Sequence, residues 1–142
     1  MAQLDFSLNH NQNISSNITP PPNGNLSILK KSVETYKLWQ EYSKHFPKIS
    51  RYSLGGKIDN LIIEMLEYIF TANYTPKTEK LPIIKKSINK CDLLKFFLQV
   101  SWEVKALDNK KFSVISENIN EIGKMLGGWH NKIKKETSTQ NK

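Results

Sequence analysis

Apolar residues recur at intervals of three and four positions along four stretches of the chain, and this spacing predicts four α-helices. The expected helices cover residues 26–46, 54–74, 78–107 and 111–134. The last has the most regular pattern, formed by Phe112, Ile115, Ile119, Ile122, Leu126, Trp129 and Ile133. No stretch shows the sustained alternation of apolar and polar residues that a half-buried β-strand has. The pattern therefore predicts an all-α protein.

Short links between these helices set their expected arrangement. Pro47 prevents an easy continuation of the first helix, because proline has no backbone N–H group to donate, and Ser53 is a plausible N-cap of the second. The links at 47–51, 75–77 and 108–110 are short enough to favour antiparallel neighbours. We therefore expect an antiparallel up-down-up-down four-helix bundle.

The third helix is apolar on two sides, which bears on self-association. One stripe consists of Cys91, Leu94, Leu98 and Ser101, and the other of Leu93, Phe97, Val100, Val104 and Leu107. A helix can bury only one such face inside its own bundle, so the face around Phe96, Phe97 and Trp102 is predicted to be an oligomer interface. The alternative is that this helix is simply central in the bundle.

Both ends of the chain differ in composition from the helical part. Residues 1–25 are rich in asparagine, contain Pro20, Pro21 and Pro22 in a row, and carry a single charge. Such a segment cannot bury enough apolar surface to offset the entropy lost on ordering. We expect a disordered tail at 1–25, a four-helix bundle at 26–134 and a polar C-terminal tail at 135–142.

Composition narrows the class of protein. The chain of 142 residues fits one domain, and its 38% hydrophobic content includes no apolar run near the ~20 residues that a membrane span needs. This excludes an integral membrane protein. The single cysteine, Cys91, excludes an internal disulfide framework and suits a reducing cytoplasm. The N-terminus lacks the basic and apolar regions of a secretory signal, so a cytoplasmic protein is expected.

The positive charge is concentrated in two regions. The chain has 21 Lys and Arg against 13 Asp and Glu, a net charge of +8. Residues 77–95 and 124–142 each carry a net charge of +4, whereas residues 54–75 carry −2. This distribution favours contact with nucleic acid, and the alternative is that the lysines form an ordinary solvated surface. Because lysine acts as a point charge, binding should be to the backbone and show low sequence specificity.

Catalytic and metal-binding patterns are scarce. His10, His45 and His130 have no spacing typical of metal ligands, and Cys91 lies on an apolar stripe, where a buried structural thiol is expected. Arg51 is the only arginine and no histidine follows it closely, so the Arg–His pattern of a helical-bundle ribonuclease is missing. We therefore expect no metal, no cofactor and no enzymatic activity.

The glycine pairs Gly55-Gly56 and Gly127-Gly128 do not match phosphate-binding loops. Glycine inside a helix is about 1 kcal/mol less favourable than alanine, so these residues need an explanation. Close approach of two helices is the structural explanation. Passage of a partner or of a nucleic-acid backbone is the functional one.

Two stretches carry a family resemblance. Residues 51–58 read RYSLGGKI and residues 121–129 read EIGKMLGGW. Together they resemble the four-helix bundle family that contains the accessory variability determinant of diversity-generating retroelements, to which proteins encoded in 23S ribosomal RNA intervening sequences are related. The resemblance covers about residues 27–133, and residues 91–98 are similar to the family's third helix.

The resemblance implies a function and a set of residues. Family members form pentameric barrels with a basic surface, are not catalysts, and partner a retroelement reverse transcriptase and its template RNA, or an RNA/DNA hybrid, in mutagenic reverse transcription. Family positions and the charge clusters together indicate nucleic-acid-binding residues, namely Arg51, Lys57, Lys85, Lys86, Lys90, Lys95, Lys124 and Lys132. The residues expected to shape packing are Leu54, Gly55, Ile58, Ile122, Gly123, Met125, Leu126, Gly127, Gly128 and Trp129.

Some features depart from the family pattern and leave alternatives open. Gln99 and its neighbours lack the arginines expected in the third helix, and the basic residues are almost all lysines. A helical-bundle interaction or structural protein of the intervening-sequence type, with no nucleic-acid role, is the alternative function. Binding to a membrane surface through the fourth helix is a weaker alternative, because the apolar stripe of that helix is expected to pack inside the bundle.

Overall fold

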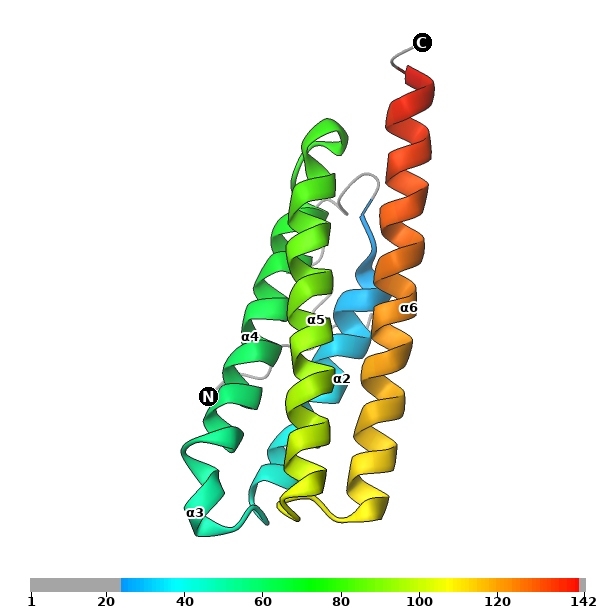
Figure 1. Ribbon diagram of the computed structural model, residues 1–142. Helices are drawn as coiled ribbons and strands as arrows, with labels where there is room; N and C mark the ends of the chain where they lie inside the picture. Colours follow the sequence, from blue (N-terminus) through cyan, green and yellow to red (C-terminus); the bar gives the residue numbers. More distant parts are fainter. Residues whose placement is uncertain (1–23, 141–142) are drawn as a thin grey trace, which may run out of the picture.

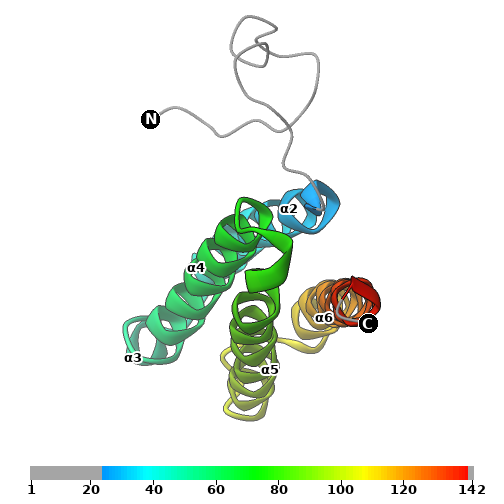
Figure 2. The same cartoon turned by 90° about the horizontal axis from the view of Figure 1, so that it is seen from above.

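The computed structural model of the protein describes residues 24–140, which contain helices and no strand. The elements are α2 (Leu26–Ser43), α3 (Lys48–Arg51), α4 (Leu54–Asn73), the 3-10 turn η1 (Lys77–Glu79), α5 (Lys80–Glu103) and α6 (Asn109–Gln140). The all-α prediction is confirmed, and the four long helices lie side by side as in a four-helix bundle (Figure 1). Seen from above, each helix packs on two neighbours, in the order α2, α4, α5, α6 and back to α2 (Figure 2).

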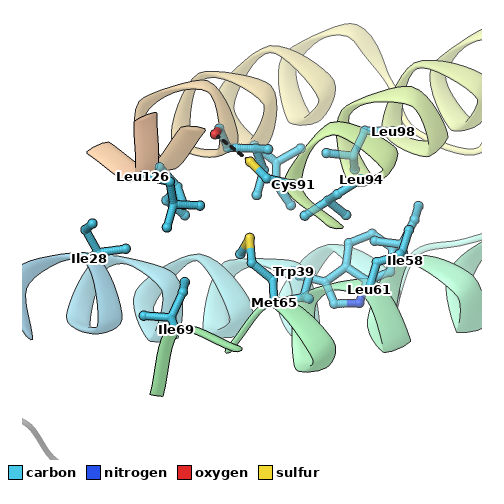
Figure 3. Close-up of a cluster of buried hydrophobic side chains, with 14 of the residues drawn as sticks. Ile28, Trp39, Ile58, Leu61, Met65, Ile69, Cys91, Leu94, Leu98 and Leu126 are labelled. Carbon is cyan, nitrogen blue, oxygen red and sulfur yellow. Dashed lines mark hydrogen bonds between the residues drawn. The ribbon is translucent and has the colours of Figure 1, made fainter. Parts of the chain in front are cut away.

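One continuous core holds the four helices together. Its side chains come from every long helix, as Figure 3 shows for Ile28, Trp39, Ile58, Leu61, Met65, Ile69, Cys91, Leu94, Leu98 and Leu126. Burying one such aliphatic side chain contributes about 1.5–3 kcal/mol. The apolar stripe predicted in the last helix is this core's α6 face, because Ile115, Ile119, Ile122 and Leu126 are fully buried.

The first helix begins as predicted but ends earlier. The side chain of Asn25 caps α2 by accepting a hydrogen bond from the N–H of Ile28 at 3.3 Å. The helix ends at Ser43 rather than at residue 46. Phe46 then folds back onto Trp39, with ring centroids 5.3 Å apart in an edge-to-face contact. Phe46 is therefore a core residue placed by the turn after α2, not by the helix itself.

A short helix, α3, occupies the segment that the sequence predicted to be only a link. Pro47 stands at its N-cap, where its fixed backbone angle and missing N–H group do no harm. The second long helix starts at Leu54 as expected, with Ser53 at the N-cap position. Ser53 occupies the N-cap position as predicted, but its hydroxyl makes no capping bond and donates instead to the carbonyl of Ser50 at 3.4 Å.

The third long helix is shorter than predicted, because a tight C-terminal turn stops it at Glu103 instead of residue 107. The N–H of Lys105 donates to the carbonyl of Trp102 at 3.0 Å, and the N–H of Ala106 donates to that of Ser101 at 2.8 Å. This pair of bonds is the Schellman arrangement, which needs a left-handed residue after the helix. Lys105 fills that position with φ 67°.

The last helix is longer than predicted at both ends. The carboxylate of Asp108 accepts a hydrogen bond from the N–H of Lys111 at 2.8 Å, so α6 starts at Asn109. The helix continues to Gln140 instead of ending at residue 134, and it extends beyond the rest of the bundle (Figure 1). An ion pair of 2.8 Å between Glu136 and Lys77 ties this extension to η1. Of the predicted N-terminal tail, residues 1–23 lie outside the described part.

Candidate nucleic-acid interface on α5 and α6

The basic residues selected from the sequence lie on four elements of the fold. Arg51 ends α3, Lys57 lies in the first turn of α4, Lys85, Lys86, Lys90 and Lys95 lie on α5, and Lys124 and Lys132 lie on α6. Because α5 and α6 are neighbours in the bundle (Figure 2), six of these eight side chains belong to one pair of adjacent helices. Their local partners divide them into two groups and two intermediate cases.

The first group is engaged in contacts within the chain. Arg51 Nη2 donates to the carbonyl oxygen of Phe46 at 3.2 Å, which satisfies a polar group in the turn after α2. Lys90 forms a 2.6 Å ion pair with Glu64 of α4, and this hydrogen bond raises the pKa of Lys90. Lys57 lies 5.8 Å above the ring of Phe97. Arg51 and Lys90 thus have structural roles in the bundle, whereas Lys57 makes only this cation–π contact and is otherwise exposed.

Lys86 and Lys95 are intermediate cases. Lys86 is exposed and lies 5.8 Å above the ring of Tyr68, a cation–π contact that leaves the charge open to solvent. Lys95 is half-buried, lies 3.8 Å from Asp92, and passes over the backbone of Gly123. Neither contact neutralises a buried charge, so both ammonium groups can still act on a ligand.

The second group faces solvent without an ion pair. Lys85, Lys124 and Lys132 are exposed, and none of them pairs with a carboxylate within residues 24–140. Beside Lys85 the structure adds two residues that sequence reasoning did not select as binding residues, His130 and Lys134. Burial first, and then the positive charges of Lys85 and Lys134, lower the pKa of His130. The sequence could have indicated that His130 and Lys134 lie together, since they are four residues apart on one helix face.

The structure removes Lys80 from the basic surface that the charge count predicted. It was counted in the basic region 77–95, yet it has no exposed surface. Its ammonium group donates to the carbonyl of Ala72 and, at 3.2 Å, to that of Asn73, and it lies 5.8 Å above the ring of Trp129. Lys80 therefore caps the C-terminus of α4 and does not contribute to the basic surface.

Half of the ten motif residues are buried inside the bundle. Gly55, Ile58, Ile122, Leu126 and Trp129 are buried. Leu54, Gly123, Met125 and Gly127 are half-buried, and Gly128 is exposed.

The glycines have different surroundings. A Cβ at Gly123 would lie 2.9 Å from Lys95 Nζ and 3.5 Å from Cys91 Sγ, so α5 approaches closely there. A Cβ at Gly56, Gly127 or Gly128 would meet no atom of the described chain within 4 Å. Close helix approach within this chain thus accounts for Gly123 and leaves Gly127 and Gly128 without a packing reason.

The three aromatic residues chosen as an oligomer interface differ in exposure. Phe96 is 57% exposed and touches Phe97 edge-to-face, with centroids 5.2 Å apart. Phe97 is half-buried against the core. Trp102 is 39% exposed, donates from Nε1 to the side-chain oxygen of Asn109 at 2.6 Å, and stacks on Phe112. Phe96 thus has the largest exposed fraction of the three. Leu93, which is 43% exposed, lies one helical turn away on the same helix.

Groups that could support catalysis are few. Cys91 is fully buried, its thiol donates to the carbonyl of Ile119 at 3.6 Å, and burial raises its pKa to about 11 (Figure 3). A thiol with this pKa is protonated near neutrality and is a poor nucleophile. In residues 24–140, no three His, Cys, Asp or Glu side chains gather in a way that could hold a metal ion. None of the described helices has the length and hydrophobicity to cross a membrane.

Comparison with known proteins identifies the family. None of the curated proteins compared with the chain matches it significantly. The family described as bAvd-like matches residues 28–133, which span all four long helices and include both glycine-containing motifs. The name bAvd denotes the Bordetella accessory variability determinant of diversity-generating retroelements. The chain therefore belongs to the bAvd-like family.

Proposed function

We propose that this protein is a non-catalytic accessory subunit of a diversity-generating retroelement, which binds the reverse transcriptase and its template RNA during mutagenic reverse transcription. Membership of the bAvd-like family over residues 28–133 is the observation that carries this proposal. The family is of an accessory, non-catalytic type. No cofactor is needed for such a role, and the reduced thiol of Cys91 suits a cytoplasmic protein.

The charge of the described helices supports RNA as a partner. Lys85, Lys124 and Lys132 are exposed cations without an ion pair in residues 24–140, and Lys86 has only an aromatic neighbour. Cations of this kind release counterions when they contact phosphates, which makes binding favourable and sensitive to salt. Lysine offers no bidentate hydrogen bonding to base edges. The proposed partner is therefore template RNA, or an RNA/DNA hybrid, bound with low sequence specificity.

The proposed assembly is a homopentamer of antiparallel bundles. In Figure 1 the links after α2 and after α5 lie at one end of the molecule and the link after α4 at the other, which supports an up-down-up-down path. Phe96 and Leu93 leave apolar surface on α5 that a second copy can cover. The number five comes from the family resemblance.

A charge-reversal variant with a matched control tests the RNA partner. Changing Lys85, Lys86, Lys124 and Lys132 to Glu should abolish measurable binding of a fluorescent template RNA at physiological salt, because favourable phosphate contacts become repulsive. The control changes Lys30, Lys37, Lys44 and Lys48 to Glu, which alters the net charge equally on exposed residues of α2, its C-cap and α3. Circular dichroism checks that both variants remain helical.

The same pair of variants tests the reverse transcriptase partner in a pull-down from purified components. Loss of both RNA and reverse transcriptase binding only in the α5–α6 variant is the expected result. If both variants lose binding equally, the loss comes from the change in net charge and not from the position of the α5 and α6 lysines. If neither variant loses a partner, the basic surface is not the interface. If the wild type itself binds no template RNA, the interaction or structural protein without a nucleic-acid role becomes the better description.

A further inference from the structure

A small pocket lies where the beginning of α2 meets α6, two helices that are neighbours in the bundle (Figure 1). Its volume is about 260 Å³, and its lining includes Gly24 before α2 and, on α6, Met125, Gly128, Trp129, Lys132 and Ile133. The α6 residues are spaced by three and four positions, so they share one face of that helix. We call this site the α2–α6 pocket.

The inner wall of the α2–α6 pocket is apolar. Trp129 and Ile133 are buried and Met125 is half-buried, whereas Gly128 and Lys132 are exposed. An apolar wall favours an occupant that buries apolar surface of its own. The volume lies below the ~300 Å³ at which pockets for small molecules begin, and far above the ~15 Å³ that holds one water molecule. The pocket therefore suits one or two side chains of a polypeptide.

The pocket also supplies a reason for Gly128. A Cβ at Gly128 would meet no atom of the described residues within 4 Å, so packing in this part of the chain does not require a glycine. Glycine is nevertheless unfavourable inside a helix. Because Gly128 lines the pocket, a larger side chain at this position would take up the space that an occupant needs.

The chain enters α2 next to this pocket. Gly24 is the first described residue and is also part of the pocket lining. Pro20, Pro21 and Pro22 precede it, separated from it only by Asn23. Two residues span at most about 7 Å, so Pro22 can reach the pocket without any rearrangement of α2. A segment tethered by so short a linker has an effective concentration at the pocket of the order of millimolar.

Three prolines in a row suit an apolar wall better than the asparagines before them. Proline has no backbone N–H group, so its burial leaves no donor without a partner. Consecutive prolines favour the extended polyproline II conformation before they bind, which lowers the entropy lost on docking. Residues 17–23 carry no charge, so docking would place no like charge beside Lys132.

We propose that Pro20, Pro21 and Pro22 dock into the α2–α6 pocket of their own chain. The contact connects the segment before α2 with the motif at residues 121–129 of α6. The asparagine-rich residues before the prolines take no part in it. A segment of a partner protein that uses this pocket must first displace the prolines. The inference does not depend on the proposed RNA and reverse transcriptase partners.

Nuclear Overhauser contacts in the chain of 142 residues test this docking directly. In the wild type, the proline rings of residues 20–22 should show contacts with the methyl group of Met125. Gly128→Leu should remove them, because the new side chain fills the pocket. Gly127→Leu is the matched control and should keep them, since a Cβ there also meets no described atom within 4 Å but Gly127 does not line the pocket.

Three outcomes of this experiment would overturn the proposal. The first is a wild type without contacts between the prolines and Met125. The second is a Gly128→Leu variant that keeps them. The third is equal loss in Gly128→Leu and Gly127→Leu, because the contacts would then not depend on the pocket.

Replacing the prolines gives a second measurement that leaves α6 unchanged. Changing the three prolines to Ser should shift the methyl resonance of Met125, because the pocket loses its apolar occupant. The matched control changes Asn9, Asn11 and Asn13 to Ser, which alters three residues of the same segment and should leave the resonance in place. An unshifted resonance in the proline variant, or equal shifts in both variants, would contradict the docking.

A mixture of isotope-labelled and unlabelled chains identifies whose prolines occupy the pocket. Contacts confined to labelled chains are expected, because the short tether favours docking within one chain. Contacts between labelled and unlabelled chains would assign the pocket to the proline segment of a second copy and overturn the proposal.

Discussion

Lys80 is a buried cation whose partners are backbone carbonyls and an aromatic ring. Its ammonium group closes the C-terminus of α4 through Ala72 and Asn73, where the last carbonyls of a helix otherwise have no partner. The face of Trp129 covers the same ammonium group at 5.8 Å. Burial lowers the pKa of Lys80. The sequence motif ending in Trp129 and the end of α4 are thus connected by one side chain.

Lys80→Met should reduce the free energy of unfolding at neutral pH by about 1–3 kcal/mol, because it leaves buried carbonyl groups without a donor. The unfolded chain holds the Lys80 proton more tightly than the folded chain. The wild type should therefore gain stability as the pH rises from the lowered pKa toward 10.5, and the variant should lack this gain. Urea unfolding at about pH 7 and about pH 10 measures both effects. Lys86→Met, at an exposed position of α5, is the control and should change stability little.

Lys105 has a backbone conformation that lysine rarely adopts. With φ 67° it occupies the left-handed position of the turn that stops α5, where glycine has no steric penalty. Lys105→Gly should therefore increase the free energy of unfolding by about 1 kcal/mol. Urea denaturation is the measurement. Lys110→Gly, in the first turn of α6, serves as the opposite control and should lower stability, since glycine is unfavourable inside a helix.

At the scale of elements, the last turns of α6 depend on a contact with η1. Glu136 and Lys77 are 2.8 Å apart, and the hydrogen bond from Lys77 is the main reason why the pKa of Glu136 is lowered. The contribution of the pair is complete above the ordinary pKa of 4.5 and is lost as the pH falls through the lower pKa of the folded state. The helix extension beyond residue 134 should therefore loosen in acid.

Glu136→Gln tests this contact in hydrogen exchange. Amides of residues 134–140 should exchange faster in the variant near neutral pH, because the charged partner of Lys77 is gone. The rest of α6 should keep its protection, since Ile133 and the residues before it are held by the core. Glu117→Gln, an exposed change on the same helix, should leave the exchange pattern as it is. Unchanged exchange in Glu136→Gln would mean that the extension is stable without the ion pair.

At the scale of the whole molecule, α5 has more apolar surface than one bundle can cover. Phe96→Glu should shift the proposed oligomer, about five times 16.4 kDa, toward single chains in light scattering, because a charge would be buried in the interface. Phe70→Glu is the matched control, since Phe70 is 54% exposed on α4 and Phe96 is 57% exposed. The helical content should be retained in both variants. An oligomer that survives Phe96→Glu places the interface elsewhere.

Much of the fold follows from local patterns. The four long helices and their buried faces could be predicted because apolar residues three or four apart define one side of a helix. The helix ends were predicted less well. Asp108 was a readable capping residue, but the end of α5 depends on a lysine in a left-handed conformation that composition does not suggest. The extension of α6 depends on Lys77, which is distant in sequence.

In the candidate site, too, some features follow from local sequence patterns and others from contacts between residues far apart in the sequence. The sequence by itself determined that the chain is helical, basic on its third and fourth long helices, and similar to a known family. Only the tertiary structure decided which cations are available: it buries Lys80, pairs Lys90 with Glu64, and brings Lys85 to His130. Periodicity assigns a residue to a face of its own helix, but the partner of a charged side chain is set by which helix packs against that face.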